Sequence, residues 1–214
     1  MSFLQLVKPL SQLREEREIS RDNSLKVAEL RLIRGSLTEL VGEASSGKTS
    51  YVIAVLSELT REGEICAVID TCDSFDPVSA FSSGVKLENL LWIRCAGDVE
   101  NAMKAADLLL QAKGFGAVWI NFGQVKSGQL SYVPNSFWFR FRTFVKDSPT
   151  LLIVTAKESL LGSSAEQSYA LTKNKSVWAG MGKFKLLKEF RLNLRSKRVL
   201  TPILSRVERN YEEV

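Results

Sequence analysis

A glycine-rich loop carries the clearest chemical signal in the sequence. It matches the phosphate-binding pattern G-x-x-x-x-G-K-[ST] at every fixed position, in the octapeptide Gly42-Glu43-Ala44-Ser45-Ser46-Gly47-Lys48-Thr49. In such a loop, successive backbone N–H groups and the positive end of a helix dipole point at phosphate oxygens. Lys48 would reach the outer phosphates, and the hydroxyl of Thr49 would bind Mg²⁺. The loop therefore predicts a site for a nucleotide and Mg²⁺.

The residues on either side of the loop support this interpretation. Residues 37–41 are typical of a short buried strand, and residues 50–60 place apolar side chains at helical spacing. Strand, glycine loop and helix are the order that phosphate binding requires. The alternative is a chance Gly/Ser turn before a helix, and the flanking elements disfavour it.

Further apolar runs alternate with helical patterns along the chain. Strands are expected at residues 65–70, 90–95, 117–122 and 151–155, and helices at 98–113 and 136–146. The alternation predicts an α/β fold, with a mostly parallel central sheet and helices on both faces. The helix at 136–146 mixes aromatic residues with arginines. Those aromatics either stack on single-stranded bases or form a core-facing stripe of Phe137, Phe141, Phe144 and Val145, and the shared helical face favours the core.

Composition excludes several kinds of chemistry. The chain has 214 residues, a net charge of +5, no histidine and three cysteines. Without histidine there is no Ser-His-Asp or Cys-His catalysis, and three scattered cysteines do not make a zinc site. No apolar run approaches the roughly 18 to 20 residues of a membrane helix, and the N-terminus lacks signal-peptide features. We expect a cytoplasmic protein with reduced cysteines and no contact with a membrane.

Three regions are expected along the chain. Residues 1–34 form an N-terminal arm or helix, residues 35–176 form the core with the phosphate-binding loop, and residues 177–214 form a basic C-terminal segment. Within the core, residues 162–176 are polar and are expected to form a mobile loop. Between residues 173 and 206 the only acidic residue is Glu189. The basic residues in the same stretch are Lys173, Lys175, Lys183, Lys185, Lys188, Arg191, Arg195, Lys197, Arg198 and Arg206. Such a stretch favours contact with phosphate backbone or an acidic partner.

Several of these stretches together resemble a known family. Residues 35–49, 64–70, 75–77 and 84–91 are similar, in order and spacing, to the ATPase core of the RecA family of recombinases. The resemblance covers about residues 35 to 155. It implies a RecA-like fold that binds ATP and Mg²⁺.

Within that superfamily, the chain most resembles ImuA, through residues 34–42, the strand at 91–95 and the short length. ImuA belongs to a DNA-damage-induced mutagenesis cassette. The resemblance therefore implies a role in translesion synthesis during the SOS response. It also implies partners: an ImuB-like polymerase homologue, RecA, or both, together with single-stranded DNA.

Departures from the RecA pattern bear on hydrolysis. Cys72 stands where RecA has the glutamate that positions the attacking water, and Asn121 stands where an aspartate would order Mg²⁺. Asp73 is a candidate substitute for the missing base. The phosphate-sensing glutamine of RecA aligns with Ala156, and the adenine-stacking tyrosine aligns with Ser79. Thr49 remains the Mg²⁺ contact, and ATP hydrolysis is expected to be weak or absent.

The resemblance also places DNA-binding loops after the strands at 117–122 and 151–155. Lys126, Lys173 and Lys175 are the cations that would reach a phosphate backbone there, although a solvated charged face is the alternative for each.

Three functions remain open at this point. The first is a repair accessory protein with degenerate hydrolytic residues, and the second is an active single-stranded-DNA-stimulated ATPase in which Asp73 or Asp70 acts as base. The third, a kinase or other nucleotide hydrolase, is the least favoured.

Overall fold

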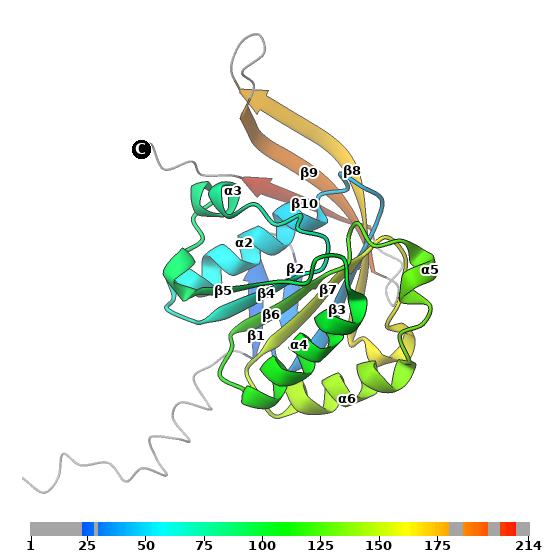
Figure 1. The fold of residues 1–214 in the computed structure, drawn as a ribbon. Helices are drawn as coiled ribbons and strands as arrows, with labels where there is room; N and C mark the ends of the chain where they lie inside the picture. The colour runs from blue at the N-terminus through cyan, green and yellow to red at the C-terminus, as the bar shows by residue number, and fades with distance from the viewer. Residues whose placement is uncertain (1–22, 28–29, 180–185, 197–201, 209–214) are drawn as a thin grey trace, which may run out of the picture.

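A computed structural model describes residues 23–27, 30–179, 186–196 and 202–208 of the chain. The expected N-terminal helix within residues 1–22 lies outside the described residues. The described chain forms one twisted sheet covered by helices on both faces, with a small two-stranded sheet against it (Figure 1).

The predicted mostly parallel sheet is confirmed. Six strands run parallel, in the spatial order β8 (Gln167–Ala179), β3 (Ser36–Val41), β7 (Leu151–Ala156), β6 (Ala117–Asn121), β4 (Cys66–Asp70) and β5 (Leu90–Arg94). Beyond β8 the sheet continues with two antiparallel strands, β9 (Leu186–Ser196) and β10 (Pro202–Glu208). The four central strands β3, β4, β6 and β7 are buried along their whole length, which explains the near-continuous apolar sequences of β4, β6 and β7.

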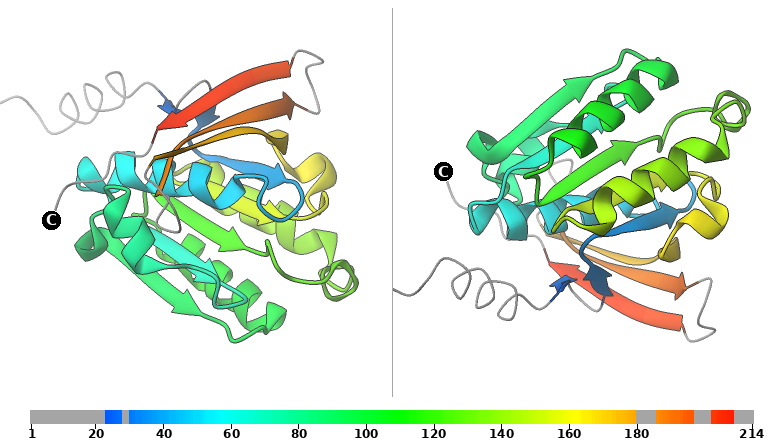
Figure 2. Two further views of the ribbon diagram at one scale, coloured as in Figure 1. Left: turned by 90° about the horizontal axis from the view of Figure 1, so that it is seen from above. Right: turned by 90° about the horizontal axis from the view of Figure 1, so that it is seen from below.

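Two separate clusters of apolar side chains form the core, one on each face of the sheet. On one face lie α2 (Lys48–Arg61), α3 (Pro77–Ser82) and the small sheet of β1 (Ser24–Val27) and β2 (Leu30–Ile33). On the other face α4 (Val99–Ala112) and α6 (Asn135–Lys146) pack side by side (Figure 2). The expected covering of both faces by helices is therefore confirmed.

The helix boundaries follow from local sequence. At the start of α4, the Asp98 carboxylate accepts a hydrogen bond from the N–H of Asn101 at 3.1 Å, as a capping residue should. Helix α2 ends before Gly63, whose φ of +81° lets the chain reverse into β4. Three short helices lie in the connections: η2 (Leu87–Asn89) before β5, α5 (Ser127–Leu130) between β6 and α6, and η3 (Gly162–Ser164) between β7 and β8.

The aromatic helix α6 packs into the core. Phe141 and Val145 are buried, and Phe137 and Phe144 pack against the same cluster, so the core-facing stripe is confirmed. The guanidinium of Arg140 lies 4.6 Å from the centroid of the Phe137 ring, an arrangement that stabilises a cation over an aromatic face. These aromatics are therefore engaged within the protein.

The expectation of a mobile loop at residues 162–176 is wrong. Residues from Gln167 onward form β8, which pairs with β3 up to the register Val41↔Ala170 and then continues to Ala179 against β9. The β8–β9 hairpin projects beyond the edge of the sheet where the parallel strands end (Figure 1). Strand β8 also runs across residue 176, so the sheet continues into the segment expected to be the basic C-terminal region.

Candidate nucleotide-binding site

The backbone of residues 42–49 curls around the start of α2. Gly47 lies at the helix N-cap with φ of +94°, and Ser45 also takes a left-handed conformation, with φ of +60°. Gly47 has no side chain to cap the helix, and the first turn of α2 carries no acidic residue. The N–H groups at this end, with the positive end of the helix dipole, are therefore arranged to receive an anion.

Gly42 is required by the packing of β8 over the loop. A Cβ at this position would lie 2.4 Å from the carbonyl oxygen of Leu171 and 2.8 Å from Oγ of Ser46. The backbone φ of +155° at Gly42 disfavours other residues as well. The first fixed glycine of the motif therefore allows β8 to pass close beside the loop.

Lys48 lies inside the loop, with its side chain buried. Its ammonium donates to the carbonyl oxygen of Gly42, to that of Glu43 at 2.9 Å and to Oγ of Ser46 at 3.2 Å. Burial lowers the pKa of Lys48, and the negative charge of Glu43 acts in the opposite direction. Thr49 is exposed at the first turn of α2. A buried ammonium, uncapped N–H groups and an exposed threonine hydroxyl are the donor set that a Mg²⁺–nucleotide phosphate requires, so the loop fits that ligand.

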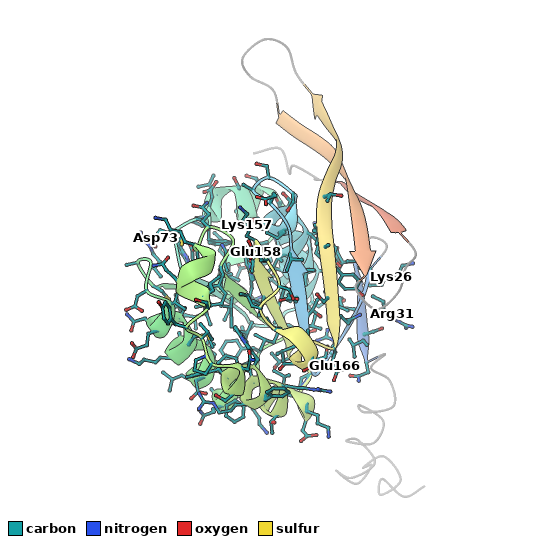
Figure 3. The ribbon with its side chains drawn as sticks, turned by 90° about the vertical axis from the view of Figure 1, so that its right-hand side faces the viewer. Lys26, Arg31, Asp73, Lys157, Glu158 and Glu166 are labelled. Carbon is teal, nitrogen blue, oxygen red and sulfur yellow. The ribbon has the colours of Figure 1, made fainter. Side chains whose placement is uncertain are left out.

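Cys72 and Asp73, the two candidates at the position of the base, follow the end of β4. Burial raises the pKa of the Cys72 thiol, and the charges of Asp70 and Asp73 raise it further. The thiol is therefore protonated at neutral pH. Asp73 has a positive φ of +52° and forms an ion pair with Arg94, whose Nε lies 2.8 Å from Oδ1. Figure 3 shows Asp73 at the margin of the molecule.

Asp70, the last residue of β4, is used to hold the following turn. Its side chain is fully buried and accepts hydrogen bonds from the N–H of Ser74 at 3.0 Å, from the hydroxyl of Ser74 at 3.3 Å and from the N–H of Phe75 at 2.8 Å. These three donors engage both carboxylate oxygens. Asp70 is therefore part of the folded scaffold rather than a group available to activate water.

Asn121, the last residue of β6, belongs to the same polar network. Its amide donates to Oγ of Ser74 at 2.9 Å, and its Oδ1 accepts from the N–H of Gly123 and from the hydroxyl of Thr155, each at 3.0 Å. Trp119 in turn donates to the Thr155 hydroxyl at 2.9 Å. The chain of bonds ties together the ends of β4, β6 and β7, and it requires an amide because Asn121 both donates and accepts.

Ser79, at the position expected for adenine stacking, lies in the first turn of α3. Its hydroxyl donates to the carboxylate of Asp76, which caps this helix. The hydrogen bond from Ser79 is the main cause of the lowered pKa of Asp76. Ser79 therefore stabilises the start of α3, and it offers no ring for a base to stack on.

The resemblance places the lysines expected to contact DNA in loops after two parallel strands; Lys126 lies in such a loop after β6, whereas Lys173 and Lys175 lie within strand β8. Lys126 is exposed, just before α5. Lys173 and Lys175 lie on β8, in the part that runs past the phosphate-binding loop, with backbone partners Leu192 and Arg191 on β9. The structure describes their backbone positions only.

Sequence reasoning missed Glu39, which lies in β3 three residues before the loop. Its fully buried carboxylate accepts hydrogen bonds from Ser159, Leu160, Leu161 and Ser168 at 2.5 to 3.0 Å. Glu39 thereby fixes the connection between β7 and β8 against the strand that leads into the loop. A lone charged residue inside an apolar strand was the signal for such a role.

Three further features of the described residues bear on function. Within the described parts of the chain, no group of three or more His, Cys, Asp or Glu residues could hold a metal ion. All three cysteines are free, as expected, with Cys66 and Cys95 buried. None of the described helices has the length and apolar character needed to cross a membrane.

Comparison with known proteins agrees with this geometry. The RecA N-terminal domain family matches residues 17–123, which include the phosphate-binding loop and the ends of β4 and β6. Among solved structures, the crystal structure of the RadB recombinase is similar with a TM-score of 0.62 and 16% identity, over 86% of this chain and 92% of that one. At this identity the likeness shows the fold alone. The family match extends over half of the sequence, and the chain belongs to the RecA N-terminal domain family.

Proposed function

We propose that this chain is an accessory protein of DNA repair and translesion synthesis that binds ATP with Mg²⁺ and hydrolyses it slowly or not at all. One observation carries the proposal. The N–H groups at the start of α2 have no side-chain cap and Thr49 is exposed, whereas Asp70 and Asn121 at the neighbouring strand ends are hydrogen-bonded within the protein. The site can therefore bind a nucleotide without catalysing its hydrolysis.

The residues that would hold the nucleotide are those of the loop. Backbone N–H groups of residues 43–48 and the ammonium of Lys48 would bind the phosphates, and the Thr49 hydroxyl would bind Mg²⁺. Bound Mg²⁺ would neutralise charge on the phosphate oxygens. The protonated thiol of Cys72 and the hydrogen-bonded carboxylate of Asp70 are not free to orient a water molecule as a base. Asp73 holds its carboxylate in an exposed ion pair with Arg94, so its role is tested by the turnover experiment below.

The first experiment measures binding and turnover of Mg²⁺–ATP by the full chain, with and without single-stranded DNA. We expect binding that Lys48→Ala weakens by about a hundredfold, because the charge-assisted contacts of the ammonium are lost. Turnover should stay near the uncatalysed background in all conditions. Urea unfolding of Lys48→Ala serves as the control that the variant remains folded.

Other outcomes of this experiment separate the alternatives. Turnover stimulated by single-stranded DNA would contradict the proposal and indicate an active recombinase-type ATPase, and a loss of that turnover in Asp73→Asn would identify the base. Transfer of phosphate to a small acceptor would indicate a kinase. Failure of the protein to bind ATP at all would remove the nucleotide from its function.

The proposed partners are single-stranded DNA and RecA, an ImuB-like polymerase homologue, or both. Support comes from the family, from the exposed Lys126 and from the basic sequence after residue 173. Binding of the full chain to labelled single-stranded DNA should weaken as salt rises. Replacing Lys126, Lys173 and Lys175 together by Ala should reduce the slope of log affinity against log salt by about two. An unchanged slope, and no co-elution with either protein, would contradict this part of the proposal.

A further inference from the structure

Lys157 is placed beside the phosphate-binding loop by the pairing of β3 with β7. The last pair in this register is Val41↔Ala156, and the N–H of Gly42 donates to the carbonyl oxygen of Ala156 at 3.2 Å. Lys157 is the next residue, so its backbone lies directly beside the first glycine of the loop. Figure 3 shows Lys157 and Glu158 at this end of the sheet.

The ammonium of Lys157 contacts the loop itself. Its Nζ lies 3.3 Å from Oε2 of Glu43, the acidic residue of the octapeptide. The negative charge of Glu43 also acts on Lys48 and raises its pKa, which opposes the effect of burial. The Glu43 carboxylate therefore interacts with two ammonium groups, one from within the loop and one from the adjacent strand end.

The contact between Lys157 and Glu43 is easily exchanged. The side chains are 49% and 77% exposed, and ion pairs so open to water contribute little to stability. A terminal phosphate carries more negative charge than a carboxylate and offers three acceptor oxygens, so it competes well for the same ammonium.

The backbone around Lys157 is held in place, so only its side chain needs to move. On one side Ala156 is bonded to Gly42, and on the other the hydroxyl of Ser159 donates to Glu39 at 2.9 Å. The N–H of Leu161 also donates to Glu39, at 3.0 Å. A cation held on a fixed backbone loses less conformational freedom when it binds.

We propose that Lys157 is a second phosphate-binding cation, which leaves Glu43 to bind the terminal phosphate of a nucleoside triphosphate. Lys157 thereby makes the site prefer a triphosphate to a diphosphate. This inference rests on the proposed nucleotide binding at the loop.

The test compares affinities of the full chain for a non-hydrolysable ATP analogue and for ADP, each with Mg²⁺, by calorimetry. Lys157→Ala should weaken binding of the triphosphate by about tenfold to a hundredfold, the range expected for a charge-assisted contact. Binding of ADP should change by less than about threefold, because ADP lacks the terminal phosphate. Glu43→Gln should tighten triphosphate binding about twofold to fivefold, and only while Lys157 is present.

Lys104→Ala is the matched control. Lys104 forms an equally open ion pair with Glu100 on α4, with Nζ 2.7 Å from Oε1 and exposures of 65% and 77%. This variant should bind both nucleotides as the original chain does. Equal losses for ATP analogue and ADP in Lys157→Ala, or no loss for either, would overturn the inference while leaving nucleotide binding in place. Absence of binding by the original chain would instead overturn both the proposed function and this inference.

Discussion

The phosphate-binding loop and the strand ends beside it use their polar groups in opposite ways. In the loop, the start of α2 is uncapped and Thr49 is exposed, and the buried ammonium of Lys48 bonds only to loop oxygens. At the ends of β4 and β6, Asp70 and Asn121 are buried and bonded within the protein. The first region is arranged for a ligand and the second for the stability of the fold.

This difference supports the proposal that nucleotide binding persists in this chain while hydrolysis is slow or absent. Phosphate binding depends mainly on backbone N–H groups and one lysine, so it tolerates changes at neighbouring strands. Hydrolysis depends on charged groups held free near the terminal phosphate. In this chain, polar groups at the ends of β4 and β6 belong instead to a network from Trp119 through Thr155 and Asn121 to Ser74 and Asp70, which holds the strand ends together.

Of the substitutions that test this difference between the loop and the strand ends, those at Asn121 should lower the unfolding free energy most. Asn121→Ala leaves the Thr155 hydroxyl and the Gly123 N–H without their acceptor, and it should cost about 1–3 kcal/mol of unfolding free energy. Asn121→Asp should cost a similar amount. The single proton of the Ser74 hydroxyl is already donated to Asp70 and cannot also serve a second carboxylate. Urea unfolding measures both effects.

Asn101 provides the control for these variants. Its amide also donates to a side-chain oxygen, that of Asp98, at 2.9 Å, but in an exposed position. Asn101→Ala should therefore change the unfolding free energy by no more than about 0.5 kcal/mol. If Asn121→Asp were as stable as the original chain and gained ATP turnover, Asn121 would be a weakened metal position rather than a structural one.

The sequence predicts the strands of the core well, because burial on both faces leaves a strong pattern. Residues 117–122 and 151–155 are mostly apolar, and they match the observed strands 117–121 and 151–156 to within one residue. Residues 37–41 also match the observed strand 36–41 to within one residue. The positions of Asp98 and Gly63 likewise indicate where α4 begins and where α2 has ended. The phosphate-binding loop needs only local sequence to be recognised.

Strand β8 shows what local sequence leaves out. Its first half, from Gln167, looks like a polar loop because its burial comes from distant partners. Ser168 donates to the buried Glu39 at 2.7 Å, while Tyr169 and Leu171 pack in the core beside α2. The sequence does not reveal the contact between Glu39 and Ser168, because the two residues lie far apart along the chain. Tertiary contact therefore overrides the local preference of this segment.

The smallest expected effect concerns Cys72, which the resemblance to RecA places at the position of the base. Its pKa lies above the ordinary thiol value through burial and the nearby charges of Asp70 and Asp73, so the thiol should stay protonated as pH rises past about 8.5. Iodoacetamide reacts with the thiolate, and labelling at pH 7 should be several-fold slower than for free cysteine. Cys66 and Cys95 are buried, and Cys72→Ser should abolish the signal.

The raised pKa of Cys72 also determines how its contribution to the unfolding free energy changes with pH. In the unfolded chain Cys72 ionises at its ordinary pKa, whereas the folded protein holds it neutral. Its contribution to stability is therefore complete at pH 7 and is lost as pH rises through the folded pKa. The fall should be smaller in Cys72→Ser. Rapid labelling at pH 7 would show an ionised Cys72, and the end of β4 would then carry a free anion beside the phosphate-binding loop, as a working ATPase requires.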